Sequence, residues 1–255
     1  MDVQFGQTSA DYAEHRQGFP TEFFDCLFRL GVDPAGQRVL DLGAGTGALA
    51  IPLAQAGAQV TALDPALQQL QALEQRAARL GLQISSVCAA AEHTGLASGS
   101  FDLVGAAQCW HWFDAQQALR EVRRVLSPTG RLLICSNDWL PEPDSLPLAS
   151  EGLIQAHNPA WHMGGGNGLH PEWKRELTAG GFEVLEEGHA DYFAEYTHAA
   201  WRGRIRASAG IAASLTPEAV AKFDREHAQL LSHRFPEDPL QVPHRYAYCM
   251  ARYAS

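Results

Sequence analysis

The residues best suited to chemistry gather in one stretch, residues 38–50, where an apolar run ends at Asp41 and is followed by Gly43, Gly45 and Gly47. Glycines allow a sharp turn and a close approach of the backbone to a ligand, and a helix start offers N–H groups that lack partners within the helix. A carboxylate at Asp41 would repel a pyrophosphate and attract an ammonium or sulfonium group. The stretch therefore predicts a nucleotide-sized cradle, and its charge favours adenosine carrying an amino acid over a dinucleotide.

The glycine spacing alone leaves the dinucleotide open, because Gly43, Gly45 and Ala48 also satisfy the pattern G-x-G-x-x-G/A. Asp64 ends the next predicted strand, ~20 residues beyond the glycines, where a carboxylate accepts hydrogen bonds from ribose hydroxyls. Its alternative role is that of N-cap for the helix predicted over residues 65–80. An NAD-dependent oxidoreductase therefore remains the alternative.

A second stretch with chemical potential is residues 108–113, spelled QCWHWF, which follows a strand predicted over 100–107. Ligands of a parallel sheet collect at the carboxyl ends of the strands, so this aromatic cluster is expected to face the cradle. His111 is a candidate for a general base, a hydrogen-bond donor to substrate, or a packed ring.

Strands that alternate with helices predict an α/β, doubly wound sheet. The expected strands are 38–42, 59–63, 82–88, 100–107, 131–136, 182–186 with an extension toward residue 193, and one near 244–251; the expected helices are 11–30, 48–56, 65–80, 114–126, 171–179, 198–214 and 217–231. A turn is expected at 127–130. The prolines and the glycine run 164–168 indicate an insertion or lid at 137–171.

One domain over residues 1–255 is expected, with a cofactor-binding core at 37–136, the insertion at 137–171 and a substrate-side part at 172–255. The insertion holds His157, His162 and His170, but their spacing matches no zinc pattern, so no metal is expected. Trp161 is expected to wall a pocket. The basic cluster 201–206 predicts either a carboxylate-binding group or a salt-bridged helix face.

Composition narrows the class of partner. A formal charge of -10 disfavours nucleic acid and favours a small molecule. The five cysteines form no C-x-x-C pair, so neither disulfides nor a zinc knuckle are expected. No segment approaches the roughly 18 apolar residues that a membrane span requires, and the N-terminus lacks a signal-like apolar region. We expect a cytoplasmic monomer or homodimer without membrane contact.

Five motifs in order across residues 37–136 resemble those of class I S-adenosylmethionine-dependent methyltransferases. They are VLDLGAGTG at 39–47, LDP at 63–65, AE at 91–92, SFDLV at 100–104 and LSPTGRL at 126–132. The resemblance implies a Rossmann-like, seven-stranded sheet that is mostly parallel, with an antiparallel last strand. It also implies S-adenosyl-L-methionine as cofactor and S-adenosyl-L-homocysteine as product.

The same resemblance assigns cofactor contacts to residues of this chain. Asp41 and the turn would hold the methionyl part, Asp64 the ribose, and Ala91 with Glu92 the adenine; the whole implied cofactor set is Asp41, Gly43, Ala44, Gly45, Gly47, Asp64, Pro65, Ala91, Glu92 and Gln108. Members often carry an acid just before the Ala-Glu pair. Here Ala90 occupies that position, which is a departure from the pattern.

A narrower resemblance, to the branch that includes trans-aconitate methyltransferases, rests on residues 12–20 (YAEHRQGFP) and on QCWHWF. The candidate substrate-binding residues are Tyr12, Arg16, Trp110, His111 and Trp161. The expected reaction is an in-line displacement of the methyl group by an oxygen, nitrogen or carbon nucleophile of a small acceptor. A carboxylate would need no base, whereas a phenol or amine would use His111 as its catalytic base.

If the acceptor is a carboxylate, Arg16 or one of Arg202, Arg204 and Arg206 is expected to hold it through paired hydrogen bonds. Besides the oxidoreductase, a non-catalytic module that keeps the cofactor fold is a further alternative.

Overall fold

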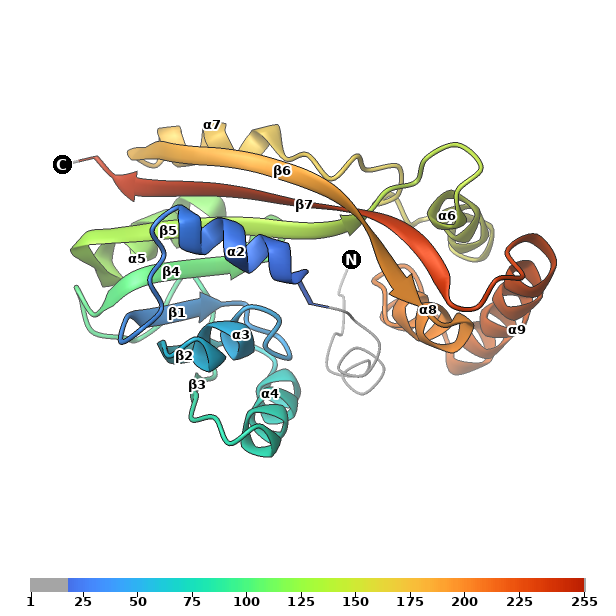
Figure 1. Cartoon of the computed structure of the whole chain (residues 1–255), viewed down its shortest axis with the longest axis horizontal. Coiled ribbons are helices and arrows are strands. Elements are labelled where there is room, and N and C mark those ends of the chain that lie inside the picture. Colours follow the sequence, from blue (N-terminus) through green and yellow to red (C-terminus); the bar gives the residue numbers. More distant parts are fainter. Residues whose placement is uncertain (1–17, 255) are drawn as a thin grey trace. The chain divides into compact units, whose positions relative to one another are not determined.

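The computed structural model describes residues 18–254 and contains a seven-stranded sheet in the order β3-β2-β1-β4-β5-β7-β6 (Figure 1). The strands are β1 (Arg38–Leu42), β2 (Gln59–Leu63), β3 (Ser85–Val87), β4 (Phe101–Ala107), β5 (Leu126–Trp139), β6 (Phe182–Tyr196) and β7 (Leu240–Tyr253). β1 pairs in parallel with β2 and β4, β2 with β3, and β4 with β5. The last strand is antiparallel, so the predicted α/β Rossmann-like sheet is confirmed.

The helices follow the predicted alternation with the strands. They are α2 (Thr21–Arg29), α3 (Ala50–Gln55), α4 (Leu67–Arg79), the 3-10 helix η2 (Trp110–Trp112), α5 (Ala115–Val125), α6 (Leu146–His157), α7 (Pro171–Ala179), α8 (His198–Arg206) and α9 (Pro217–Arg234). Local sequence fixes several starts. The Asp114 side chain caps α5 by accepting from the Gln117 N–H at 3.0 Å. Thr216 caps α9 in the same way, just before Pro217.

Three local expectations are wrong. Of the helix expected over residues 11–30, the described residues 18–20 are not helical, and α2 begins at Thr21. The residues expected to form a turn at 127–130 lie within β5. Leu126 pairs with Phe101 and Arg131 pairs with Leu103, so the pairing of β4 with β5 has an irregular register there. Gly130 permits this, because a Cβ there would lie 3.0 Å from the Phe101 carbonyl oxygen. The helix expected to reach residue 214 ends at Arg206.

The segment 137–171 is more regular than its prolines indicate. It contains α6, which begins after Ser145, whose hydroxyl accepts from the Leu148 N–H at 3.3 Å. Pro147 stands in the first turn of this helix, where its missing N–H removes no hydrogen bond within the helix. The prolines therefore mark a helix start and not only irregular chain.

The chain divides into two compact units. We call them the sheet unit, comprising the described residues of Gly18–Asn137, His170–His189 and 246–254, and the helical unit, comprising Asp138–Leu169 and Ala190–Arg245. The first holds β1 to β4 with α2 to α5 and α7, and the second holds α6, α8 and α9, while β5, β6 and β7 contribute residues to both. The single-domain expectation and its boundaries stay predictions.

Each unit has its own apolar core. In the sheet unit, buried side chains of β1, β4 and β5 pack with those of α5 and α7, and Leu40, Val104, Leu119 and Leu177 are nearly inaccessible. In the helical unit, Trp201 of α8 packs with α6 and α9 in a core that includes Ile154, Phe223 and Leu231. These cores fix the positions of the polar groups described next.

Candidate active site

The turn that follows β1 is a tight glycine turn. Gly43, Gly45 and Gly47 have φ angles of +62°, +53° and +90°, in the left-handed region that glycine adopts without strain. A Cβ at Gly43 would lie 2.8 Å from the Cys109 Cβ, and a Cβ at Gly47 would lie 2.9 Å from the Ile51 Cγ1. The predicted need for glycine at these positions therefore has two physical reasons, backbone conformation and close packing.

Asp41 is completely buried at the carboxyl end of β1. Its Oδ2 accepts from the Ala50 N–H at 3.0 Å, whereas its Oδ1 is buried with no hydrogen-bond partner among the described residues. Burial raises the pKa of Asp41 to about 8 against the hydrogen bond from Ala50, and the charge of Asp64 raises it further. Such a carboxylate is stabilised by any positive group that reaches it.

Asp64 joins the glycine turn to the start of α4. Its Oδ2 accepts from the Gly45 N–H at 2.9 Å and its Oδ1 from the Ala66 N–H at 2.8 Å, while burial raises its pKa. The N-cap of α4 is Ala66, so Asp64 is not the N-cap itself. Each carboxylate oxygen keeps a further lone pair that can accept from a hydroxyl.

These two carboxylates change the expected character of the cradle. The backbone N–H groups of Gly45 and Ala50 are occupied by Asp64 and Asp41, so they are not open donors for a ligand anion. The cradle instead presents two buried carboxyl groups, and a bound cation would favour their ionised form. This corrects the expectation that the helix start offers unpaired N–H groups, because the Ala50 N–H is engaged by Asp41.

Gln108 lies directly after β4 with a φ of +60°, a strained conformation for a residue other than glycine. Its N–H donates to the Cys135 carbonyl at 2.8 Å, and its side-chain Nε2 donates to the Asn137 carbonyl at 2.8 Å. The next residue, Cys109, has its Sγ 3.0 Å from the Leu42 carbonyl oxygen. The stretch therefore lies at the carboxyl ends of β1 and β4, as its sequence position predicts.

Trp110 and His111 differ in exposure although they are neighbours. Trp110 is 3% exposed, and its indole Nε1 donates to the Glu176 Oε2 at 2.7 Å, so its polar atom is already engaged. His111 is exposed, with its ring 4.8 Å from that of Trp112. Of the two, His111 has the exposure that a group acting on a substrate needs.

The predicted adenine turn reaches the same region through Glu92. Its Oε1 accepts from the Asp114 N–H at 2.9 Å, which ties the turn to the start of α5. Ala91 is buried in the core of the sheet unit, and the Pro65 carbonyl oxygen lies 3.6 Å from the Cys88 Sγ. Sequence positions far apart thus meet around the ends of the central strands.

Other predicted residues lie elsewhere. Trp161 is 5% exposed in the core of the helical unit, so the structure gives it a packing role. Tyr12 and Arg16 lie outside the described residues. Within residues 18–254, no group of three or more His, Cys, Asp or Glu residues could hold a metal ion. His157 is paired with an acid of another helix, because its Nε2 is 2.8 Å from the Glu226 Oε2.

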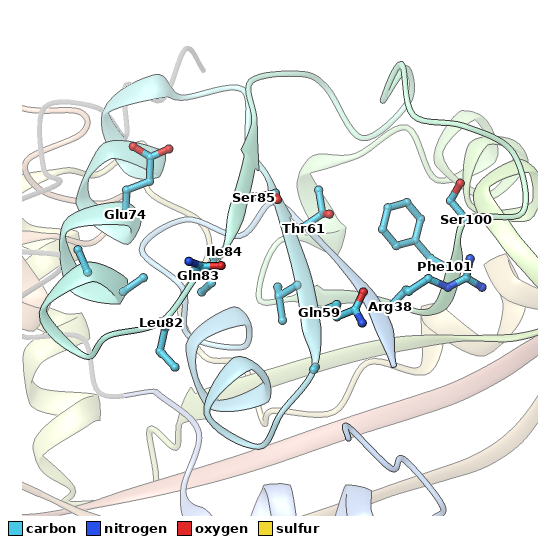
Figure 2. Close-up of a pocket in the computed structure, with 14 residues that line it drawn as sticks. Arg38, Gln59, Thr61, Glu74, Leu82, Gln83, Ile84, Ser85, Ser100 and Phe101 are labelled. Carbon is cyan, nitrogen blue, oxygen red and sulfur yellow. The ribbon is translucent and has the colours of Figure 1, made fainter. Parts of the chain in front are cut away.

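An open pocket of about 630 Å³ lies on a different part of the sheet unit. Figure 2 shows its lining, which includes Arg38, Gln59 and Phe101, the first residues of β1, β2 and β4. Asp41 and Gln108 belong to the opposite ends of these strands. This pocket is therefore not the predicted cradle.

Sequence reasoning missed several groups that shape the cradle. The Arg76 Nη1 donates to the Thr46 carbonyl at 2.7 Å, and the Asn137 Nδ2 donates to the Gly18 carbonyl at 3.0 Å. The position of Asn137 could have indicated a role at the site, because it directly follows the apolar strand expected at 131–136. Arg76 had none, since its contact depends on how α4 packs.

Comparisons with known proteins agree with this geometry. The family described as "Methyltransferase domain" matches residues 40–134. An uncharacterized methyltransferase of Mycobacterium tuberculosis is 41% identical over 136 residues, which cover 52% of this chain and 51% of that protein. Malonyl-[acyl-carrier protein] O-methyltransferase of Geobacter sulfurreducens is 36% identical over 132 residues, or 49% and 48% of the two chains. The chain spans about half the length of the curated relatives it matches.

Among solved structures, the S-adenosylmethionine-dependent methyltransferase of Thiobacillus denitrificans, in complex with S-adenosyl-L-homocysteine, shares the fold. Its TM-score is 0.58 at 20% identity, and the alignment covers 100% of both chains. No helix within residues 18–254 combines the length and the apolar character needed to cross a membrane. Residues 40–134 of this chain thus match the methyltransferase domain family, and the described chain has the fold of a structure that binds S-adenosyl-L-homocysteine.

Proposed function

We propose that the protein transfers the methyl group of S-adenosyl-L-methionine to a small-molecule acceptor and releases S-adenosyl-L-homocysteine. The observation that carries the proposal is the pair of buried carboxylates, Asp41 and Asp64, around the glycine turn inside residues 40–134. The orphaned Asp41 Oδ1 fits a cofactor that carries positive charge. A pyrophosphate would meet repulsion at the same place, and the matched family gives the oxidoreductase alternative no support.

The proposed cofactor contacts follow the geometry. Asp41 and the turn containing Gly43, Ala44, Gly45 and Gly47 would hold the methionyl part, and Asp64 with Pro65 the ribose. Ala91, Glu92 and Gln108 would complete the site around the adenine. When bound, the cofactor supplies an activated methyl group on a positively charged sulfur.

The chain's own task is then to align the acceptor and to exclude water, which removes about 7 to 11 kcal/mol of barrier in favourable cases. His111, exposed on η2, is our candidate to accept the proton of a phenol or amine. A carboxylate acceptor would require no base. We favour an oxygen acceptor, because one curated relative is by name an O-methyltransferase.

Calorimetric titration with S-adenosyl-L-homocysteine tests the cofactor assignment. We expect D64N to weaken binding by about tenfold or more, because the amide has lost the charge and one acceptor of the carboxylate. The matched control is D102N, since Asp102 pairs with Arg38 at the amino ends of the strands. Equal affinities of wild type and D64N, or tighter binding of NADH than of S-adenosyl-L-homocysteine, would contradict the proposal.

A further inference from the structure

Three arginines on α8 of the helical unit have different surroundings. The Arg206 Nη1 lies 2.7 Å from the Asp224 Oδ1 of α9, and Arg202 also pairs with Asp224. Residues two apart on a helix do not face each other in the way that residues three or four apart do. Arg204, between the two, forms no ion pair within 4.0 Å among the residues that the structure describes. The hypothesis that one of these arginines binds a carboxylate therefore narrows to Arg204.

Arg204 lies on an aromatic surface. Its guanidinium carbon is 4.7 Å from the centroid of the Trp139 ring. The side chain is half-buried, and burial lowers its pKa, although the charges of Tyr196 and Asp138 and hydrogen bonding to the Tyr196 side chain raise it. A cation that has lost part of its hydration and has no ion-paired carboxylate binds an added anion more strongly than an exposed arginine does.

The surface beneath Arg204 is held in place by a buried glutamate. The Trp139 Nε1 donates to the Glu151 Oε1 at 2.7 Å, and the Gly165 N–H donates to the other oxygen, Oε2, at 2.8 Å. Glu151 is 8% exposed. The Trp139 ring also meets the Trp201 ring edge to face at 5.7 Å. Trp139 is thus fixed before any ligand arrives.

A second aromatic pair extends this surface without adding positive charge. The rings of Tyr196 and His244 stack at 5.8 Å, and the His244 Nδ1 lies 3.0 Å from the Val242 carbonyl oxygen. Burial lowers the pKa of His244 to about 4, so the ring is neutral at physiological pH. Arg204 is therefore the cation of this cluster that an anion would meet.

We propose that the helical unit binds a small organic carboxylate, with the Arg204 guanidinium as its anchor and the ring of Trp139 as the surface that orients the guanidinium. Besides its hydrogen bond to the Tyr196 side chain, the Arg204 guanidinium carries further N–H donors, and two of these match a carboxylate with two parallel hydrogen bonds. The nearby charge of Asp138 favours a single negative charge over a phosphate dianion. Glu151 is a positioning residue that acts through Trp139.

This inference concerns the helical unit alone and does not require the proposed methyl transfer. Its probes are benzoate, succinate and citrate, each compared with its neutral amide by calorimetric titration at constant ionic strength. We expect at least one carboxylate to bind wild type while its amide does not. R204M, which keeps most of the apolar stem, should weaken that binding by about tenfold or more, and R204K by less.

The matched control is R202M. Arg202 is already paired with Asp224, so we expect this substitution to leave carboxylate binding unchanged. E151Q should weaken carboxylate binding less than R204M does. It should also change the near-ultraviolet circular dichroism of Trp139, a signal that would stay unchanged if Glu151 acted only through its charge. Three results would overturn the proposal: wild type binds none of the three carboxylates, it binds acid and amide equally, or R204M and R204K both bind as tightly as wild type. Titration of S-adenosyl-L-homocysteine into R204M should match wild type, which separates this test from that of the cofactor.

Discussion

The two units hold their charged side chains in different ways. In the sheet unit, Asp41 and Asp64 accept hydrogen bonds from main-chain N–H groups, those of Ala50, Gly45 and Ala66. In the helical unit, the arginines of α8 contact side chains on other elements: Arg206 pairs with Asp224, and Arg204 lies over the Trp139 ring. Carboxylates held by a rigid backbone suit a cationic cofactor, and an arginine held on aromatic rings suits an anion. The difference separates two kinds of ligand by charge.

Burial acts on both units by favouring the neutral form of an ionisable group. It raises the pKa of Asp41 in the sheet unit to about 8 and lowers the pKa of His227 in the helical unit to about 4. The contribution of Asp41 to stability is therefore larger at low pH, and that of His227 is larger at higher pH. The opposite signs distinguish the contribution of Asp41 from that of His227.

The largest expected effect concerns Asp41. Between pH 3.8 and about 8 the folded protein holds a proton that the unfolded chain has lost, so this group's contribution to stability decreases as the pH rises. D41N resembles the protonated form and lacks this decrease. We expect the free energy of unfolding of D41N, relative to wild type, to rise by about 2–5 kcal/mol across the range, as urea titrations would measure. Parallel pH profiles would contradict the assignment.

The next effect concerns the packing of the glycine turn. G43A places a Cβ 2.8 Å from the Cys109 Cβ at a φ of +62°, so we expect a loss of about 2–4 kcal/mol in unfolding free energy. G99A is the matched control, because Gly99 has a φ of +67° but nothing within 4 Å of an added Cβ. It should lose only about 1 kcal/mol. Chemical denaturation that gives equal losses would show that the contact with Cys109 carries no cost.

The smallest effect concerns the helical unit. The His227 Nε2 lies 3.1 Å from the Ser150 Oγ, and the side chain is completely buried. As the pH falls from 6.5 to about 4, the unfolded chain gains a proton there before the folded protein does, so stability falls. We expect H227Q to flatten this decrease by about 1–3 kcal/mol in urea titrations. His244, with a similar pKa, remains in both proteins, so an unchanged slope would assign the acid sensitivity to His244.

Much of the sheet unit was predictable, because its signals are local in the sequence. Apolar runs that end in glycine or an acid predicted β1 and β2, a third run predicted β4, and the residues after those strands predicted the site at their carboxyl ends. The burial of Trp110 was not predictable, since its indole is engaged by Glu176 of α7, a helix distant in the sequence. The cofactor contacts of the glycine turn, Asp64 and Glu92 stay predictions.

The helical unit shows where sequence reasoning reaches its limit. The basic cluster at residues 201–206, with its three arginines, is evident from the order of residues alone. That Arg202 and Arg206 pair with Asp224 while Arg204 lies over the Trp139 ring follows from the packing of α8 against other elements. The physical reason is that strand and turn signals come from neighbouring residues, whereas the partner of a long charged side chain depends on how helices and strands distant in sequence pack together.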